Sequence, residues 1–263
     1  MTGTLVLAQL SQEQIREKIL HTWDAASHAW VIPIKIGSLD LSITKSIWFL
    51  FIGAAITFLI LFVGSRLLKD RPGAYQVIVE DIYGFGRNHI AGQQGEEGRR
   101  FFPYTLTLFI FILTLNLLGL FPNSFPVTSS ISFTFTLAIL TFLITQYQGF
   151  RRNGVGGYMK SFAPPGMPKP MVPFIWSLEF LQQFTQPLTL GLRLYANMLA
   201  GHLLIFVFLS LILTFGTFAA VISVPAAIVL YAFEIFVAVI QAYIFAILSQ
   251  VYIEQAVFAS EAH

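Results

Sequence analysis

The chain contains no cysteine and few charged residues. Without thiols it can form neither a disulfide framework nor a thiolate-ligated metal site. Only 11% of its 263 residues are Asp, Glu, Lys or Arg, whereas soluble domains average about 25%. A chain with so few charges lacks the polar groups that would solvate the surface of a water-soluble globule. The net charge of +2 gives no indication of nucleic-acid binding.

Apolar side chains take up most of the sequence instead, with 56% hydrophobic residues, 27 Phe and a mean hydropathy of +0.74. A helix that crosses the hydrocarbon core of a bilayer needs about 20 mostly apolar residues. The sequence therefore predicts an all-α polytopic membrane protein with about five membrane helices. They are expected near residues 46–65, 104–121, 131–147, 174–215 and 225–258.

The breaks between these helices follow from Gly, Pro and turn-forming residues. Two prolines interrupt residues 121–126, a Gly- and Pro-rich loop is expected over residues 151–173, and the last two helices are separated near residues 216–225. The last two are longer than a perpendicular crossing requires. We expect them to form an antiparallel hairpin that is tilted or nearly in the membrane plane.

Loop charges predict the orientation in the membrane. Residues 66–100 hold six Lys or Arg against five acids, and residues 151–169 hold four Lys or Arg and no acid. Basic loops face the cytoplasm, so the N-terminus is expected outside and the C-terminus inside a bacterial inner membrane. This divides the chain into an external segment, residues 1–45, and a membrane domain, residues 46–263. Within the first segment, residues 10–30 could form an amphipathic surface helix.

The last two predicted helices carry polar and charged residues that lipid does not favour: Glu179, Arg193, Asn197, His202, Glu234 and Gln241. A charge at the bilayer centre costs about 2.5–3.5 kcal/mol on insertion scales. Arg193 stays protonated in almost any surroundings, whereas Glu and His can bind and release protons. Such residues usually face the interior of a helix bundle or a water path. Glu254 and Glu261 are expected at solvated ends, and His21, His28 and His89 lie too far apart in sequence to predict a metal site.

Helical geometry predicts which of these residues lie on the same side of a helix. At about 100° and 1.5 Å per residue, Glu179, Arg193 and Asn197 share a face, and His202 points to the opposite side. In an antiparallel hairpin, the register that brings Gln241 level with Arg193 also brings Glu234 close to the level of His202. The sequence thus predicts an Arg193–Gln241 contact and a His202–Glu234 pair nearer the outside, with aqueous approaches on two sides of the helix.

Three segments carry a family resemblance: residues 190–202 (LGLRLYANMLAGH), 240–245 (IQAYIF) and 109–122 (FIFILTLNLLGLFP). In these the chain resembles subunit a of F-type ATP synthases, and the likeness extends from about residue 40 to the C-terminus. The arginine motif inside an apolar helix, followed 48 residues after Arg193 by the glutamine of the second motif, is highly specific. One departure is Gly119, where some members carry an aspartate.

The resemblance implies a role for each residue. Arg193 would face the proton-carrying carboxylate of a ring of c subunits, supported by Gln241 and Asn197. His202 and Glu234 would form the polar pair of the outer half-channel, in the order found in mitochondrial-type members. The remaining implied channel residues are Glu179 on the inner side, Asn116 on the outer side and the hydroxyl of Thr136.

The resemblance also implies partners. These are the c-ring, the peripheral-stalk subunit b, the other ATP synthase subunits, protons and the lipid bilayer. It implies no catalytic site within this chain, no cofactor and no nucleic acid.

Several of these residues could also have a purely structural role. His202 could be an interior histidine held by hydrogen bonds, Glu179 a helix-start acid after Pro173, and Gln241 a packing residue. A secondary transporter or ion channel could use a buried arginine to bind an anion, although no internal repeat of the kind found in transporters is visible. A passive scaffold subunit of a respiratory complex would not need Arg193 together with a His–Glu pair.

Overall fold

The computed structural model describes residues 35–36, 39–40, 45–66, 81, 83–84, 86, 99–121, 124–162, 168, 170–215 and 217–259. The surface helix expected at residues 10–30 lies outside these residues. Two short strands, β1 (Lys35–Ile36) and β2 (Leu39–Asp40), pair antiparallel. Most of the other described residues are helical. They form five long helices, α3 (Lys45–Arg66), α6 (Phe102–Leu120), α7 (Ile131–Lys160), α8 (Val172–Phe215) and α9 (Thr217–Val257), and two short 3-10 helices, η2 (Arg99–Phe101) and η3 (Val127–Ser129).

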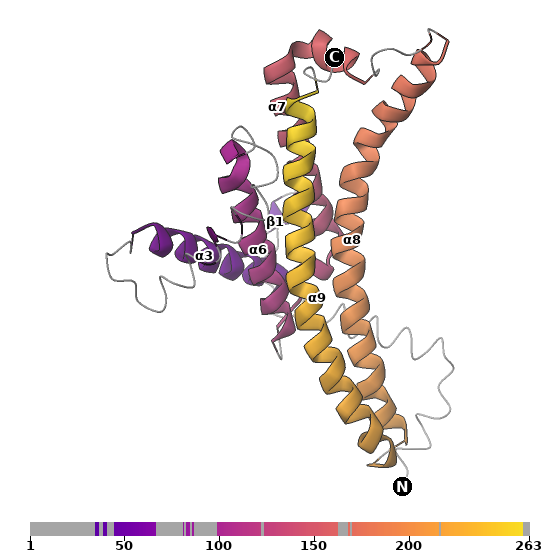
Figure 1. Cartoon of the computed structure of the whole chain (residues 1–263). Helices are drawn as coiled ribbons and strands as arrows, with labels where there is room; N and C mark the ends of the chain where they lie inside the picture. Colours follow the sequence, from indigo (N-terminus) through magenta and orange to yellow (C-terminus); the bar gives the residue numbers. More distant parts are fainter. Residues whose placement is uncertain are drawn as a thin grey trace.

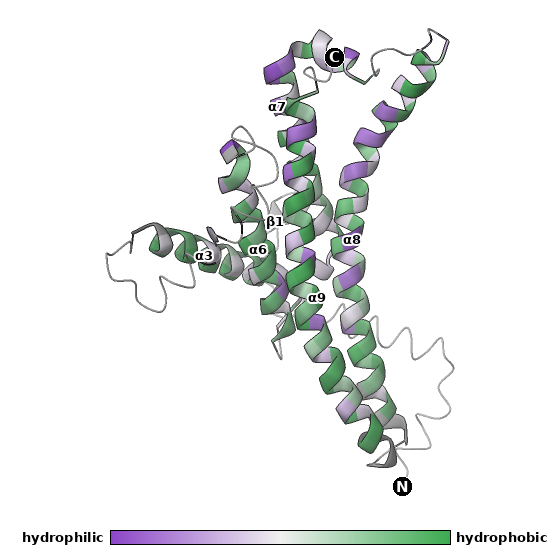
Figure 2. Cartoon of the chain, in the orientation of Figure 1, coloured by the Kyte–Doolittle hydropathy of each residue, from purple (hydrophilic) through white to green (hydrophobic). Residues whose placement is uncertain are grey.

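Each of these five helices contains a stretch long and apolar enough to cross a membrane. The all-α polytopic class predicted from the sequence is confirmed. Apolar residues on α3 are widely exposed, among them Phe51, Phe58 and Leu59, each more than 60% exposed, as expected of a helix in contact with lipid. Figure 2 shows the same apolar character along α3 and around the connected ends of α8 and α9.

Helix α8 has 44 residues and would be about 66 Å long if straight, roughly twice the thickness of the hydrocarbon core. Neither it nor the 41-residue α9 can cross a bilayer perpendicularly within lipid. The two helices run side by side as an antiparallel hairpin, and α3 lies across their direction (Figure 1). This agrees with the strongly tilted hairpin that their lengths predict.

The separation expected between these two helices over residues 216–225 is wrong, because α9 already begins at Thr217. Pro225 lies inside α9, as Pro187 lies inside α8. Proline removes one backbone donor, and in membrane helices neighbouring groups compensate for the loss. A proline therefore does not end a membrane helix as reliably as it ends a soluble one.

Helix α7 is also longer than expected. The sequence predicts a loop from residue 151, but α7 continues to Lys160 with a kink at Gly154, whose φ is +67°. After the kink the chain folds back, so that Tyr158 packs on Gly149; a Cβ at residue 149 would lie 2.7 Å from the Tyr158 ring. The glycines of this segment permit a bend and a close contact inside the helix, and the loop prediction for residues 151–160 is wrong.

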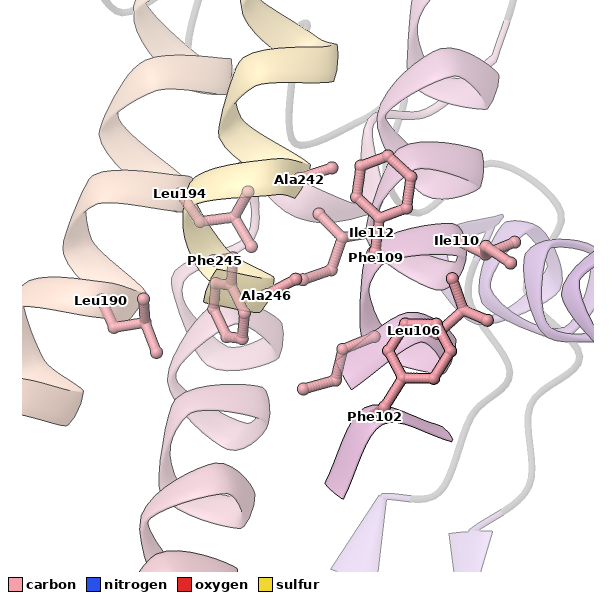
Figure 3. Packing of buried hydrophobic residues seen from close by; sticks show 11 residues of the cluster. Phe102, Leu106, Phe109, Ile110, Ile112, Leu190, Leu194, Ala242, Phe245 and Ala246 are labelled. Atoms are coloured by element: carbon pink, nitrogen blue, oxygen red, sulfur yellow. The ribbon is translucent and has the colours of Figure 1, made fainter. Parts of the chain in front are cut away.

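Helix α6 is the most enclosed element and packs against both α3 and α9. Its Phe109 and Ile112 lie toward Ala242 and Ala246 of α9, and Leu190 and Leu194 of α8 lie beside Phe245 of α9 (Figure 3). Small residues such as the two alanines allow helix backbones to approach closely. This core fixes the register of α8 against α9, and that register positions the polar residues.

Candidate functional site

The closest polar pair between the two long helices is His202 on α8 and Glu234 on α9. The imidazole Nδ1 lies 3.5 Å from the carboxylate Oε1, and the side chains are 13% and 4% exposed. The pairing predicted from the antiparallel register is confirmed. An imidazole beside a carboxylate can accept and pass on a proton, so this pair has the chemistry of a relay.

Gly201 leaves the space that Glu234 occupies. A Cβ at residue 201 would lie 2.6 Å from Oε1 and 2.9 Å from Cδ of Glu234. The sequence motifs alone do not point to a role for this glycine. The glycine itself could have indicated this role. Glycine inside a helix is about 1 kcal/mol less favourable than alanine, so a glycine next to His202 suggests that another group packs closely there.

Arg193 lies on the outside of the chain. It is nine residues, or about 14 Å along α8, from His202, and it is exposed where His202 is largely buried. The two side chains therefore point to different sides of α8, as the helical wheel predicts. The hydroxyl of Tyr252 on α9 lies within electrostatic range of Arg193. Within the described residues, no carboxylate lies within 4 Å of the guanidinium.

Gln241 does not reach Arg193 in this structure. Its side chain is 4% exposed, and its Nε2 has no hydrogen-bond partner in the described part of the chain. The predicted Arg193–Gln241 contact is therefore absent, because the Arg193 side chain is exposed on α8 and the Gln241 side chain is buried in the helix bundle. Asn197 is half-buried, one turn beyond Arg193 on α8.

Asn116 ties α6 to the acidic end of α9. Its side chain is fully buried and donates from Nδ2 to the backbone carbonyl of Ala238, at 3.2 Å. Ala238 lies four residues after Glu234, so this amide sits about one helical turn from the His–Glu pair. The structure thus gathers Asn116, His202 and Glu234 in one region between α6, α8 and α9.

Two other predicted residues lie apart from this region. Thr136 is exposed on α7, and its hydroxyl donates to the Ser132 carbonyl of its own helix at 2.7 Å. Glu179 is half-buried on α8, 14 residues and about 21 Å before Arg193. Thr136 is therefore on an exposed face of α7, and Glu179 is at a different height along α8 from the His–Glu pair.

Glu254 contradicts the prediction of a solvated end. It is 5% exposed and accepts a hydrogen bond from the side chain of Gln250. The end of α9 is enclosed because Asn153, on the extended part of α7, donates to the Ala256 carbonyl at 2.8 Å. The longer α7 therefore covers residues that the sequence pattern predicts in water.

Comparisons with known proteins give consistent results. A family model described as "ATP synthase A chain" matches residues 47–254. A protein of Rubrobacter xylanophilus named "ATP synthase subunit a" is 65% identical over 257 residues, which covers 97% of this chain and 100% of that protein. Proteins with the same name from Parvibaculum lavamentivorans and Mesorhizobium japonicum are 38% and 40% identical over 233 and 238 residues, covering 86% and 88% of this chain.

Proposed function

This chain belongs to the ATP synthase A chain family, and on that premise we propose that it is the stationary Fo subunit that couples proton flow to ring rotation. The observation that carries the proposal is the position of Arg193. A permanent cation is exposed on α8 among exposed apolar residues such as Leu188 and Leu192. No acid among the described residues pairs with it, and in this proposal its counter-ion is a carboxylate of another subunit.

A ring carboxylate is the partner that fits this surface. A charge in lipid costs about 2.5–3.5 kcal/mol, and an opposite charge brought by a neighbouring helix offsets part of that cost. Ala196 and Ala200 lie three and seven residues beyond Arg193, on the same side of α8, and both are exposed. Small residues of this kind favour close packing of a second helix. This face of α8 is the proposed ring-facing surface.

The buried polar region supplies the outer half-channel in this proposal. His202 and Glu234 exchange protons with the outside, and Asn116 orients the neighbouring part of α9. The pair and Arg193 lie on different sides of α8, which keeps the entering proton apart from the guanidinium. Glu179, further along α8, marks the inner half-channel, and Gln241 and Asn197 line the level of Arg193. Thr136 is proposed as a channel hydroxyl only through the family resemblance.

The mechanism is electrostatic. A ring carboxylate that arrives from lipid is neutral, because burial without a partner disfavours the charged form. Beside Arg193 the ionised form is favoured, so the proton leaves through the inner half-channel. The guanidinium also prevents protons from passing directly between the half-channels. Each charge that crosses releases about 2.3 kcal/mol per 100 mV, and ring rotation uses this free energy.

The rival function is a secondary transporter whose arginine binds an anionic substrate. Such sites lie inside the protein, where discontinuous helices end near the bilayer midplane. Here α8 is continuous from Val172 to Phe215 and Arg193 is on its outer surface. Both features favour a partner protein over an enclosed substrate.

The loop charges support an outside N-terminus and a cytoplasmic C-terminus. The bacterial relatives support a bacterial inner membrane, and subunits b and c are proposed partners. Purification of the tagged chain in a mild detergent tests the function. We expect it to elute with a small two-helix proteolipid that has a mid-membrane carboxylate, and with the subunits of an ATPase head. Elution of the stably folded chain without either would contradict the proposal.

A further inference from the structure

A cavity of about 370 Å³ lies at the end of the molecule remote from the His–Glu pair, a size typical of small-ligand pockets. It forms where the turn before α6, the part of α7 just before the Gly154 kink and the end of α9 meet. Its lining residues are Arg100, Phe101, Gln148, Arg151, Arg152 and Val257. None of these described lining residues is acidic, and three are arginines.

The walls of the cavity are held in place by contacts between α7 and the end of α9. The Arg152 guanidinium lies over the Phe258 ring, 5.4 Å from its centroid, in a cation–π contact. The adjacent Asn153 donates to the Ala256 carbonyl at 2.8 Å. These contacts hold α7 against the end of α9 beside the arginines. Guanidinium groups match phosphate oxygens in geometry and charge.

An apolar face of α7 leads to this cavity. Leu140, Tyr147 and Arg151 lie at positions i, i+7 and i+11 and so share one side of the helix. Leu140 is 46% exposed and Tyr147 is 61% exposed. Tyrosine is typical of the level where hydrocarbon meets the headgroups, and Arg151 lies one turn beyond it. A molecule with a phosphate and acyl chains fits both parts of this surface, whereas a free anion uses only the cavity.

We infer that this cavity binds the phosphate of an anionic phospholipid headgroup, with its acyl chains along the exposed face of α7. Basic pockets between membrane helices are suited to such headgroups. The site is on the side of the basic loops, at the far end of α9 from Glu234, and takes no part in the proposed proton path.

Native mass spectrometry of the delipidated, detergent-purified complex tests this inference. The probes are phosphatidylglycerol, zwitterionic phosphatidylcholine and inorganic phosphate. We expect phosphatidylglycerol to remain bound to the chain at concentrations where phosphatidylcholine does not. The double variant Arg100→Gln/Arg151→Gln should weaken phosphatidylglycerol binding by about thirty-fold, given the usual contribution of each basic residue near an anionic lipid.

Lys160→Gln is the control for loss of positive charge, because it removes one such charge, half of the change in the double variant, from an exposed position on α7 that does not line the cavity. Its phosphatidylglycerol affinity should equal that of the unchanged protein. Equal binding of both lipids, or an equal loss in the double variant and the control, would overturn the inference. Displacement of phosphatidylglycerol by equimolar inorganic phosphate would also overturn it, since the site would then recognise a free anion.

Discussion

The substitution Gly201→Ala tests the His–Glu relay through a residue that cannot itself carry a proton. The new methyl group would lie 2.6 Å from Oε1 of Glu234, and an ordinary contact begins at 3.4 Å. The carboxylate must therefore retreat from α8 by about 0.8 Å. Its present distance to Nδ1 of His202 is 3.5 Å, so a retreat of this size directly away from His202 lengthens the distance to about 4.3 Å, beyond ion-pair range.

A misplacement of this size costs up to about a hundredfold where proton transfer depends on geometry. We expect ATP-driven proton pumping in inverted vesicles to fall by roughly tenfold, which corresponds to about 1.4 kcal/mol of activation free energy. Assembly should be unaffected, because alanine stabilises a helix relative to glycine by about 1 kcal/mol. A loss of pumping would then reflect the displaced carboxylate.

Two further variants isolate the cause. Gly156→Ala makes the same change where a Cβ would have no neighbour within 4 Å, so its pumping rate should be normal. Combining Gly201→Ala with Glu234→Asp removes the clash but leaves the carboxylate one methylene further from His202, so the rate should stay low. Normal pumping by Gly201→Ala in a fully assembled complex would refute the packing argument.

The same helix packing can be probed at three more places. His202→Ala and Glu234→Ala should each slow pumping, with the double variant costing less than the sum of the two; strict additivity in pumping rates would mean that the residues act separately. Cysteines introduced together by Gly201→Cys and Glu234→Cys in this cysteine-free chain should crosslink on mild oxidation, because a Cβ at residue 201 would lie 3.2 Å from Cγ of Glu234; crosslinking only after a shift of a full turn would contradict the register. Asn116→Leu removes the bond from α6 to α9 and should lower the stability in detergent by about 0.6–1.7 kcal/mol, measured by thermal unfolding; an unchanged melting temperature would show that the amide is not needed for packing.

The sequence was sufficient to predict the five membrane helices, although not all of their bounds, and the pairing of His202 with Glu234. Long uncharged stretches form helices in lipid, because only a helix satisfies all of its backbone hydrogen bonds within the segment. A short turn makes consecutive helices antiparallel, so residue numbers give the height at which residues of the two helices lie. The predicted contact between Arg193 and Gln241 was wrong, because the register along two helices does not determine which side of each helix a side chain occupies: Arg193 is exposed and Gln241 is buried.

The errors share a physical origin in tertiary contacts. Pro225 and the glycines near Gly154 are helix breakers by local preference, yet surrounding helices keep both segments helical. The burial of Glu254 follows from the unexpected extension of α7, which no local pattern around Glu254 reveals. Local chemistry predicts which residues are costly in lipid, and only the assembled helices show which of them are enclosed.

The most direct test of the central claim is the pumping activity of Arg193→Lys, with Arg193→Ala beside it. A guanidinium stays charged when a ring carboxylate is neutral, whereas a lysine amine near lipid can lose its proton. We predict that both variants assemble with the ring and the ATPase head but that neither pumps protons on addition of ATP to inverted vesicles. Pumping at the unchanged rate by assembled Arg193→Lys would contradict the claim that a permanent guanidinium on this face of α8 couples proton flow to rotation.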